Sequence, residues 1–215
     1  MTDKKAEISI IFYEKNDGSM PAKDFILSLD EKLRAKTLRN IRLLAKVGTA
    51  LREPESSKLD DGIFEIRTKV GTTLTRVLYF FCIGKKAVLA VLTNGFVKKT
   101  QKTPKREIEK AKTYREDFLK RSKKMSNKFE DFLNEQLKDP KVKKEYDALE
   151  AKYTLIESII LARKEKNLTQ KELSQLTGIT QADLSKIENG NANPSLNTLL
   201  KLAKGLGKKL QISLV

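Results

Sequence analysis

The spacing of apolar residues changes from one half of the chain to the other, and this change constrains the fold more than any other feature. In the first half, the segments "GIFEIRTKV", "TLTRVLYFFCI" and "KAVLAVLTNGFVKK" are rich in β-branched and aromatic residues, which is typical of strands. Only short turns such as "GT" and "GKK" separate them. Because parallel pairing would need longer crossovers, the sequence predicts an antiparallel meander.

Helical patterns flank these three strands. An opening strand is predicted in "EISIIFYEK", Pro21 begins a short helix, and a second helix ends near Gly48. After Pro104 the apolar spacing is helical again, up to about residue 121. The first half is therefore predicted to be α+β, with helices packed on an antiparallel sheet.

The second half carries almost no strand signal before its last residues. Phe129, Phe132, Leu133 and Leu137 recur at helical spacing, and Asp139-Pro140 is a good start for the next helix. Four short helical patterns follow from Leu155, and the final "KLQISLV" is typical of a strand. The second half is predicted to be all-α, with a short terminal strand.

Two of these helices stand at a diagnostic spacing in "TQKELSQLTGITQADLSKIENG", residues 169–190. Thr169 and Thr180 are each suited to cap a helix, and Gly178 between them can take the positive φ of a tight turn. The residues expected to be buried are Leu173, Leu176, Ile179, Leu184 and Ile187. This spacing predicts a helix-turn-helix.

The stretch resembles the Cro-repressor (XRE) family of helix-turn-helix proteins, from about Leu155 to Gly205. The resemblance implies that the second helix enters the DNA major groove by its N-terminal end. Gln181 could then pair with an adenine edge, and Lys186 with guanine or a phosphate. Gln170 would contact a phosphate or brace Gln181. The predicted DNA-binding residues are Gln170, Thr180, Gln181, Ala182, Ser185, Lys186, Asn189 and Asn191.

Composition narrows the chemistry that the chain can perform. Histidine is absent and Cys82 is the single cysteine, which excludes Ser-His-Asp and Cys-His catalysis, histidine-ligated metals and an internal disulfide. No cofactor is expected. The net charge is +16, and residues 1–121 carry 27 Lys and Arg against 16 Asp and Glu. A basic first half suggests a polyanion such as nucleic acid, and the lack of a signal peptide or membrane span favours the cytoplasm.

The strand pattern brings two arginines together. If Gly71-Thr72 forms a two-residue hairpin turn, Arg67 lies opposite Arg76 in the ladder. Two facing cations destabilise a sheet unless an anion sits between them, and Glu65 on the same face is one candidate. Lys98, Lys99 and Lys58 converge from two other segments. The cluster is either a phosphate clamp or a solvated basic face with ordinary ion pairs.

The segments "SSKLDDGIFEIRTKVGTTLTRVLYFF" and "VLTNGFVKKTQKTPKREIEKAKTYREDF" resemble the RelE/ParE superfamily, specifically its HigB-like, phage Gp49-like branch. The resemblance covers residues 7–121 and implies a ribosome-dependent mRNA endoribonuclease. Arg67 and Arg76 would stabilise the reacting phosphate, and Lys98 or Lys99 would bind phosphate or act as base. Glu65 and Lys58 are further acid–base candidates, and Lys102 and Lys105 would bind RNA. ParE-type relatives instead poison DNA gyrase, but the paired arginines favour the RNase branch.

Together the halves resemble a HigB toxin followed by its HigA antitoxin. The expected domains are 1–121 (toxin), 122–126 (junction, with Met125), 127–153 (helical antitoxin segment) and 154–215 (helix-turn-helix). Segment 127–153 is either a toxin contact or a core face of the antitoxin. The joined halves are either a natural fusion or two chains written as one.

The expected partners are mRNA on the ribosome and palindromic operator DNA, bound by a dimer of toxin–antitoxin units without any membrane. As repressor, the antitoxin half would also silence its own operon. The alternative is a DNA-binding transcriptional regulator whose basic N-terminal domain is not catalytic.

Overall fold

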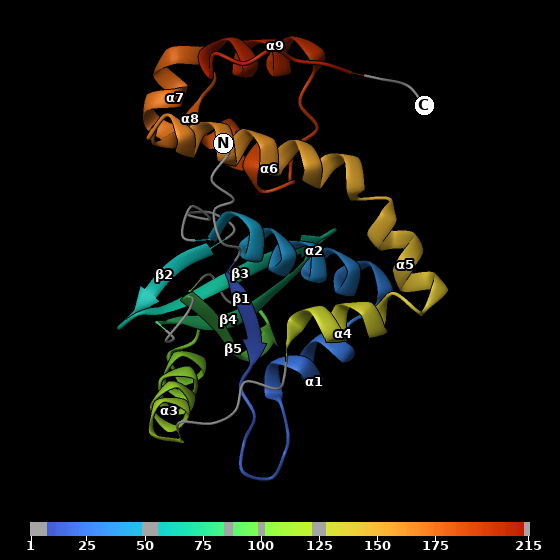
Figure 1. Cartoon of the computed structure of the whole chain (residues 1–215), viewed down its shortest axis with the longest axis vertical. Helices are drawn as coiled ribbons and strands as arrows, with labels where there is room; N and C mark the ends of the chain where they lie inside the picture. Colours follow the sequence, from blue (N-terminus) through green and yellow to red (C-terminus); the bar gives the residue numbers. More distant parts are fainter. Residues whose placement is uncertain (1–7, 49–55, 84–87, 99–101, 122–127, 213–215) are drawn as a thin grey trace, which may run out of the picture. The chain divides into compact units, whose positions relative to one another are not determined.

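The computed structural model describes residues 8–48, 56–83, 88–98, 102–121 and 128–212. The chain divides into two compact units, Met1–Glu150 and Ala151–Val215. The first unit is an α/β structure and the second is helical (Figure 1). Among the described residues, no helix is long and apolar enough to cross a lipid bilayer.

A five-stranded mixed sheet forms the centre of the first unit, in the order β1-β5-β4-β3-β2. The predicted meander is confirmed, since β3, β4 and β5 pair antiparallel. The opening strand β1 instead pairs parallel with β5, which is possible because two helices and three strands intervene in the chain. The strands are β1 (Ser9–Phe12), β2 (Ser56–Asp60), β3 (Ile63–Val70), β4 (Thr73–Ile83) and β5 (Val88–Val97).

Helices cover both faces of this sheet (Figure 1). Helices α1 (Pro21–Leu27) and α2 (Glu31–Val47) lie on one face, where Thr37 Oγ1 of α2 donates a hydrogen bond to Thr68 Oγ1 of β3 at 3.2 Å. Helix α3 (Lys105–Arg121) covers the other face. The apolar core beneath α3 comprises Ile11, Tyr13, Ile63, Leu78, Phe80, Leu89, Val91 and Ala111.

Two short helices, α4 (Phe129–Gln136) and α5 (Pro140–Asp147), also belong to the first unit. The ring of Phe12 in β1 packs edge-on against Phe132 at 5.2 Å, and Phe129 is fully buried. The Asp139 side chain caps α5 by accepting a hydrogen bond from the Lys141 amide, as predicted. These helices pack on β1 and α2, on the α2 side of the sheet.

The second unit contains four helices. They are α6 (Glu150–Glu165), whose first residue belongs to the first unit, α7 (Gln170–Thr177), α8 (Gln181–Glu188) and α9 (Leu196–Gly205). Thr169 and Glu172 form a full capping box at α7, and Gly178 takes a left-handed conformation with φ +67°. Its core comprises Ile159, Ala162, Leu173, Leu184, Ile187, Leu202 and Leu206. The predicted helix-turn-helix is therefore confirmed as a structure.

Two expectations for this unit were wrong. Leu176 is 60% exposed, because Thr177, one residue on, faces α9 and lies close to Gly205. The described part of the predicted terminal strand "KLQISLV", residues 209–212, is not in a strand, and residues 213–215 lie outside the described residues. A strand requires a hydrogen-bonded partner, and the described residues of this unit contain no strand that could provide one.

Candidate functional site

The first candidate site is built on the β3–β4 ladder, where Arg67 and Arg76 face each other as predicted. Between them lies the Glu65 carboxylate, whose side chain is 1% exposed. Arg67 Nε donates to Glu65 Oε1 at 2.8 Å, and Arg76 Nε forms an ion pair with the same oxygen at 3.4 Å. The hairpin register thus converts a repulsive pair of cations into an ion triad.

Thr103 completes the coordination of this carboxylate. Its hydroxyl donates to Glu65 Oε2 at 2.7 Å, so both carboxylate oxygens are engaged. Burial raises the pKa of Glu65, but the hydrogen bonds from Thr103 and Arg67 and the nearby charge of Arg76 outweigh it and lower the pKa. Glu65 is therefore ionised at neutral pH and holds the two arginines, which is unlike a general acid.

Lys98 follows the end of β5 and adds a third cation. Its backbone amide donates to the Leu74 carbonyl at 2.7 Å, which fixes residue 98 beside β4. Burial and the charges of Arg76 and Arg67 lower the pKa of Lys98, although Glu65 opposes this. Arg67 and Arg76 thus share one carboxylate, and the charge of Lys98 lies near all three groups, an arrangement that favours a bound anion.

The two arginines differ in accessibility. The Arg67 side chain is 30% exposed and can reach a ligand, whereas that of Arg76 is 6% exposed. Arg76 Nη1 donates to the Thr75 carbonyl at 2.8 Å, and burial lowers the pKa of Arg76. Arg67 is therefore the arginine that can contact a substrate directly, with Arg76 behind it.

The structure gives less detail on the remaining predicted residues of this site. Lys102 and Lys105 are exposed before and at the start of α3, where they can extend a basic surface. Lys99 and the side chain of Lys58 lie outside the described residues. Thr103 was missed by the sequence reasoning, because nothing in its local sequence indicates that it reaches Glu65 across 38 positions of chain.

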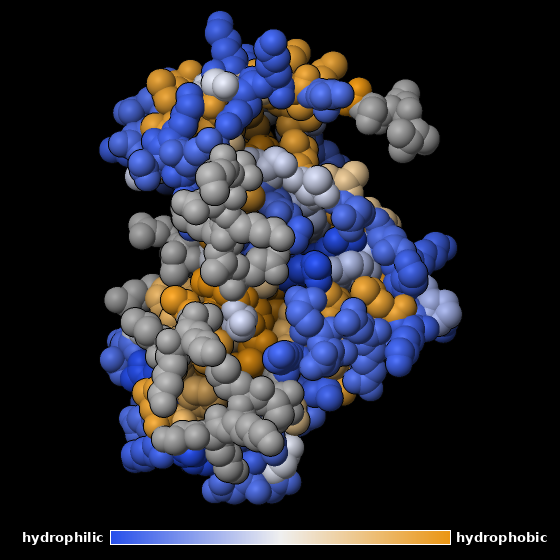
Figure 2. All heavy atoms as spheres, viewed as in Figure 1, coloured by the Kyte–Doolittle hydropathy of each residue, from blue (hydrophilic) through white to orange (hydrophobic). Residues whose placement is uncertain are grey.

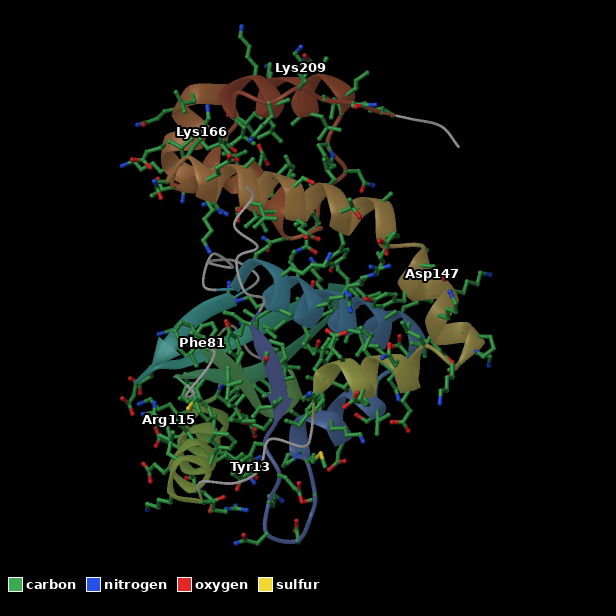
Figure 3. All side chains as sticks on the ribbon, viewed as in Figure 1. Tyr13, Phe81, Arg115, Asp147, Lys166 and Lys209 are labelled. Atoms are coloured by element: carbon green, nitrogen blue, oxygen red, sulfur yellow. The ribbon has the colours of Figure 1, made fainter. Side chains whose placement is uncertain are left out.

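Helix α3 is held against the sheet by the β2–β3 turn. Lys112 pairs with Asp60 at 2.7 Å. Arg115, which is labelled in Figure 3, pairs with Asp61 at 2.6 Å. At its far end, the Tyr13 hydroxyl donates to Asp117 Oδ2 at 2.5 Å. These contacts fix the position of α3, and Thr103 lies in the segment just before the N-terminus of this helix.

The second candidate site is the outer face of α8. The side chains of Gln181, Ala182 and Lys186 are exposed, and Ser185 is half-buried. Thr180 caps the helix by accepting from the Asp183 amide at 3.1 Å. The N-terminal end of α8 therefore presents polar side chains and a capped helix terminus, as a groove-reading helix requires.

A buried ion pair fixes the orientation of α8. Arg163 Nε and Nη2 donate to the two oxygens of Glu188 at 2.7 and 2.8 Å, and Gln170 Nε2 donates to Glu188 Oε2 at 2.8 Å. This contact joins α6, α7 and α8. Gln170 therefore braces Glu188. The sequence analysis suggested that Gln170 would contact a phosphate or brace Gln181.

The two asparagines after α8 are placed differently from each other. Asn191 is exposed, so its side chain can reach a phosphate. Asn189 is only 7% exposed, and its Oδ1 has no hydrogen-bond partner. Asn189, which the sequence predicted to bind DNA, is thus largely buried within this unit, next to the turn at Gly190 (φ +63°).

Two family models match the chain, one within each unit. Residues 24–116 match the phage-derived Gp49-like protein family, and residues 159–212 match the helix-turn-helix family. The chain therefore carries a Gp49-like domain followed by an XRE-type helix-turn-helix domain. No solved structure matches the chain.

Two curated relatives match the helix-turn-helix half. A protein of Haemophilus influenzae described as an uncharacterized HTH-type transcriptional regulator is 45% identical over 58 residues, which is 27% of this chain and 59% of the relative. The HTH-type transcriptional regulator y4dJ of Sinorhizobium fredii is 47% identical over 45 residues, or 21% of this chain and 58% of the relative. The chain thus spans less than two thirds of either relative.

Proposed function

We propose that this chain, which joins a Gp49-like domain to a helix-turn-helix domain, is a toxin–antitoxin pair of the HigB–HigA kind. Its first unit would be an mRNA endoribonuclease that acts on the ribosome. Its second unit would bind operator DNA and repress the operon. The observation that carries the proposal is that Arg67 and Arg76 face each other around one buried carboxylate. The charge of Lys98 lies close enough to influence this group.

The chemistry requires only groups of this cluster and a water molecule. The 2′-oxygen of one nucleotide attacks the adjacent phosphorus while its proton passes to Lys98 Nζ, whose lowered pKa favours the neutral amine. The bond from phosphorus to the 5′-oxygen breaks, and that oxygen takes a proton from water. The products are a 2′,3′-cyclic phosphate and a free 5′-hydroxyl. Arg67 stabilises the negative charge that develops on the phosphate oxygens.

Glu65 serves this reaction as a positioning residue. Without its charge, the like charges of Arg67 and Arg76 would separate the two side chains. Thr103 orients the carboxylate from the segment before α3. Lys102 and Lys105 would bind the flanking RNA backbone, and the pair is exposed as this role requires.

The second unit supports recognition of DNA. Gln181 and Lys186 on α8 would contact base edges, and Ala182, Ser185 and Asn191 would complete the contact. Both relatives are described as transcriptional regulators of the helix-turn-helix type, which supports this role. Because one such unit offers a small contact, two would bind a palindromic operator as a dimer.

Expression of residues 1–121 in cells, with and without residues 125–215, tests the proposal. We expect the fragment alone to stop growth and to cause translation-dependent mRNA cleavage, mapped from RNA 5′ ends. Arg67→Ala should restore growth. A harmless fragment that leaves mRNA intact would refute the nuclease assignment.

A non-catalytic basic domain attached to a regulator is the second candidate. The 6% exposure of the Arg76 side chain favours it, since a buried arginine held by Glu65 can be purely structural. In that case the full chain would still repress its operator, and the Arg67→Ala substitution would change nothing in cells. Inhibited DNA supercoiling without mRNA cleavage would instead indicate a gyrase poison.

A further inference from the structure

Asp183 lies in the first turn of α8 and is not among the residues that the sequence predicted to bind DNA. A recognition helix enters the major groove by its N-terminal end, so even a short side chain in its first turn lies close to the bases. Leu184 and Ile187 are buried and mark the inner face of α8. The side chains of Asp183 and Lys186 are 53% and 59% exposed, and Figure 2 shows hydrophilic residues around the visible part of this helix. Both side chains therefore stand where DNA can reach them.

The two oxygens of the Asp183 carboxylate have different partners. Oδ2 accepts a hydrogen bond from the Thr180 hydroxyl at 2.8 Å, and Oδ1 accepts one from Lys186 Nζ at 2.9 Å. The hydrogen bonds from Lys186 and Thr180 lower the pKa of Asp183, so at neutral pH the carboxylate is ionised and can only accept. Capping of α8 accounts for the contact with Thr180. An exposed ion pair adds little stability, so the Asp183–Lys186 pair is available for another task.

This pair presents a donor beside an acceptor, which complements the edge of a G·C base pair. In the major groove, guanine offers the acceptors N7 and O6, and cytosine offers the N4 amino group as a donor. Guanine O6 and cytosine N4 are hydrogen-bonded to each other, so they lie about 3 Å apart. Lys186 Nζ and Asp183 Oδ1 lie 2.9 Å apart. The ammonium can thus donate to guanine while the carboxylate accepts from cytosine, and neither side chain has to leave the other.

An A·T base pair fits the same two side chains less well. Its adenine N6 and thymine O4 also offer a donor beside an acceptor. If the Asp183 carboxylate accepts from N6, however, the adenine N7 acceptor lies next to it, and a carboxylate has no proton to give to N7. The thymine methyl group then lies on the Lys186 side of O4. In a G·C pair, by contrast, the second acceptor lies on the Lys186 side, where the ammonium can donate to it.

We propose that Asp183 and Lys186 together read one G·C base pair in each half of the operator, with Lys186 donating to guanine and Asp183 accepting from cytosine. This inference rests on the proposed action of the second unit as an operator-binding repressor. It assigns Lys186 to a base edge, where the sequence left guanine and phosphate open. Because the pair is neutral as a whole, it adds selectivity and little of the charge-driven attraction to DNA of any sequence.

Binding-site selection with the full chain tests the proposal. The probe is a duplex library with a random core of about 20 base pairs, long enough for two half-sites one helical turn apart. We expect the wild type to enrich one G·C pair in each half-site. Replacing that pair by T·A in the selected duplex should weaken binding about tenfold.

Two variants separate the roles of the pair. Asp183→Asn keeps the size of the side chain and can still accept from Thr180, so α8 should form. It should enrich T·A as well and reduce the penalty to about twofold, because an amide can bond both N6 and N7 of adenine. Lys186→Met changes an exposed side chain and should lose the G·C enrichment.

Glu172→Gln is the matched control. Glu172 holds the same place in α7, where it forms a capping box with Thr169, and the substitution removes the same charge. It should leave the G·C enrichment and the T·A penalty unchanged.

The possible results separate this inference from the function on which it rests. The paired readout would be overturned by a selected motif without an enriched G·C pair, by full discrimination in Asp183→Asn, or by the same loss in Glu172→Gln. Each of these results would leave a selected operator, and with it the proposed repressor, intact. A wild-type chain that binds all duplexes alike would refute the repressor, and the paired readout with it.

Discussion

Arg67 and Arg76 face each other across the β3–β4 ladder and share one oxygen of the Glu65 carboxylate. Two facing cations would normally weaken a strand pair. Here the carboxylate is buried, and Thr103 binds its second oxygen. The triad therefore links catalysis in the proposed nuclease to the stability of its sheet.

Glu65→Gln should destabilise the first unit by about 3–5 kcal/mol, because it leaves the buried guanidinium of Arg76 without a counter-charge. Urea unfolding followed by circular dichroism measures this. Glu109→Gln is the matched control, since Glu109 is exposed and pairs with Lys112 at the surface, and it should change stability little. A loss below about 1 kcal/mol in Glu65→Gln would contradict the ion triad.

The same residue predicts how stability depends on pH. The pKa of Glu65 is lowered in the folded chain, so the unfolded state binds its proton at higher pH. The contribution of Glu65 is therefore complete above the ordinary pKa and is lost as the pH falls through the lowered one. Urea midpoints measured between pH 6 and pH 3 should fall, and Glu65→Gln should flatten this slope. Parallel slopes in the two proteins would contradict the prediction.

The part of this site that the sequence could predict depends on local rules. Gly71 takes φ +56°, and the two-residue turn that it permits fixes the register of Arg67 against Arg76, nine positions away in the sequence. Thr103 could not be predicted in the same way, because its contact with Glu65 depends on how α3 docks on the sheet. Strand β2 was missed for a related reason. Its residues "SSKLD" have little strand propensity and pair only because β3 is beside them.

In the helix-turn-helix, too, local features could be predicted from the sequence and contacts between distant elements could not. Capping by Thr169 and Thr180 and the turn at Gly178 are local and were predicted correctly. The exposure of Leu176 was not predicted. Apolar residues three positions apart indicate a helix, but they do not indicate which of them contacts a third helix. Thr177 meets α9 at Gly205 instead.

Truncation to alanine should therefore destabilise the second unit much more at Leu173 than at Leu176. Leu173→Ala removes a fully buried side chain from the core of the second unit and should cost about 2–5 kcal/mol. Leu176→Ala removes a side chain that is 60% exposed and should cost well under 1 kcal/mol. Thermal unfolding of the full chain, with DNA binding as a second measure, distinguishes them. Equal costs would mean that Leu176 is covered by a partner in solution.

The rate of the proposed mRNA cleavage should rise with pH through the pKa of Lys98, which is lower than that of an ordinary lysine. Arg67→Gln removes one positive charge that lowers this pKa, so the profile of residual activity should move to higher pH. Glu65→Gln removes the charge that raises it, so the profile should move to lower pH. Cleavage by ribosome complexes, measured from pH 6 to pH 10, gives both shifts. Movement of both variants in the same direction would exclude Lys98 as the base.

Gln181→Ala should weaken operator binding by about 1–3 kcal/mol, because the exposed amide near the start of α8 would lose a bidentate contact with a base edge. Binding to random DNA should hardly change. Lys171→Ala is the matched control from the exposed side of α7, and it should weaken both DNAs alike and reduce the salt dependence if it meets a phosphate. Fluorescence anisotropy on both DNAs at two salt concentrations separates these effects. An equal loss on operator and random DNA in Gln181→Ala would show that α8 contacts the backbone and that the sequence is read elsewhere.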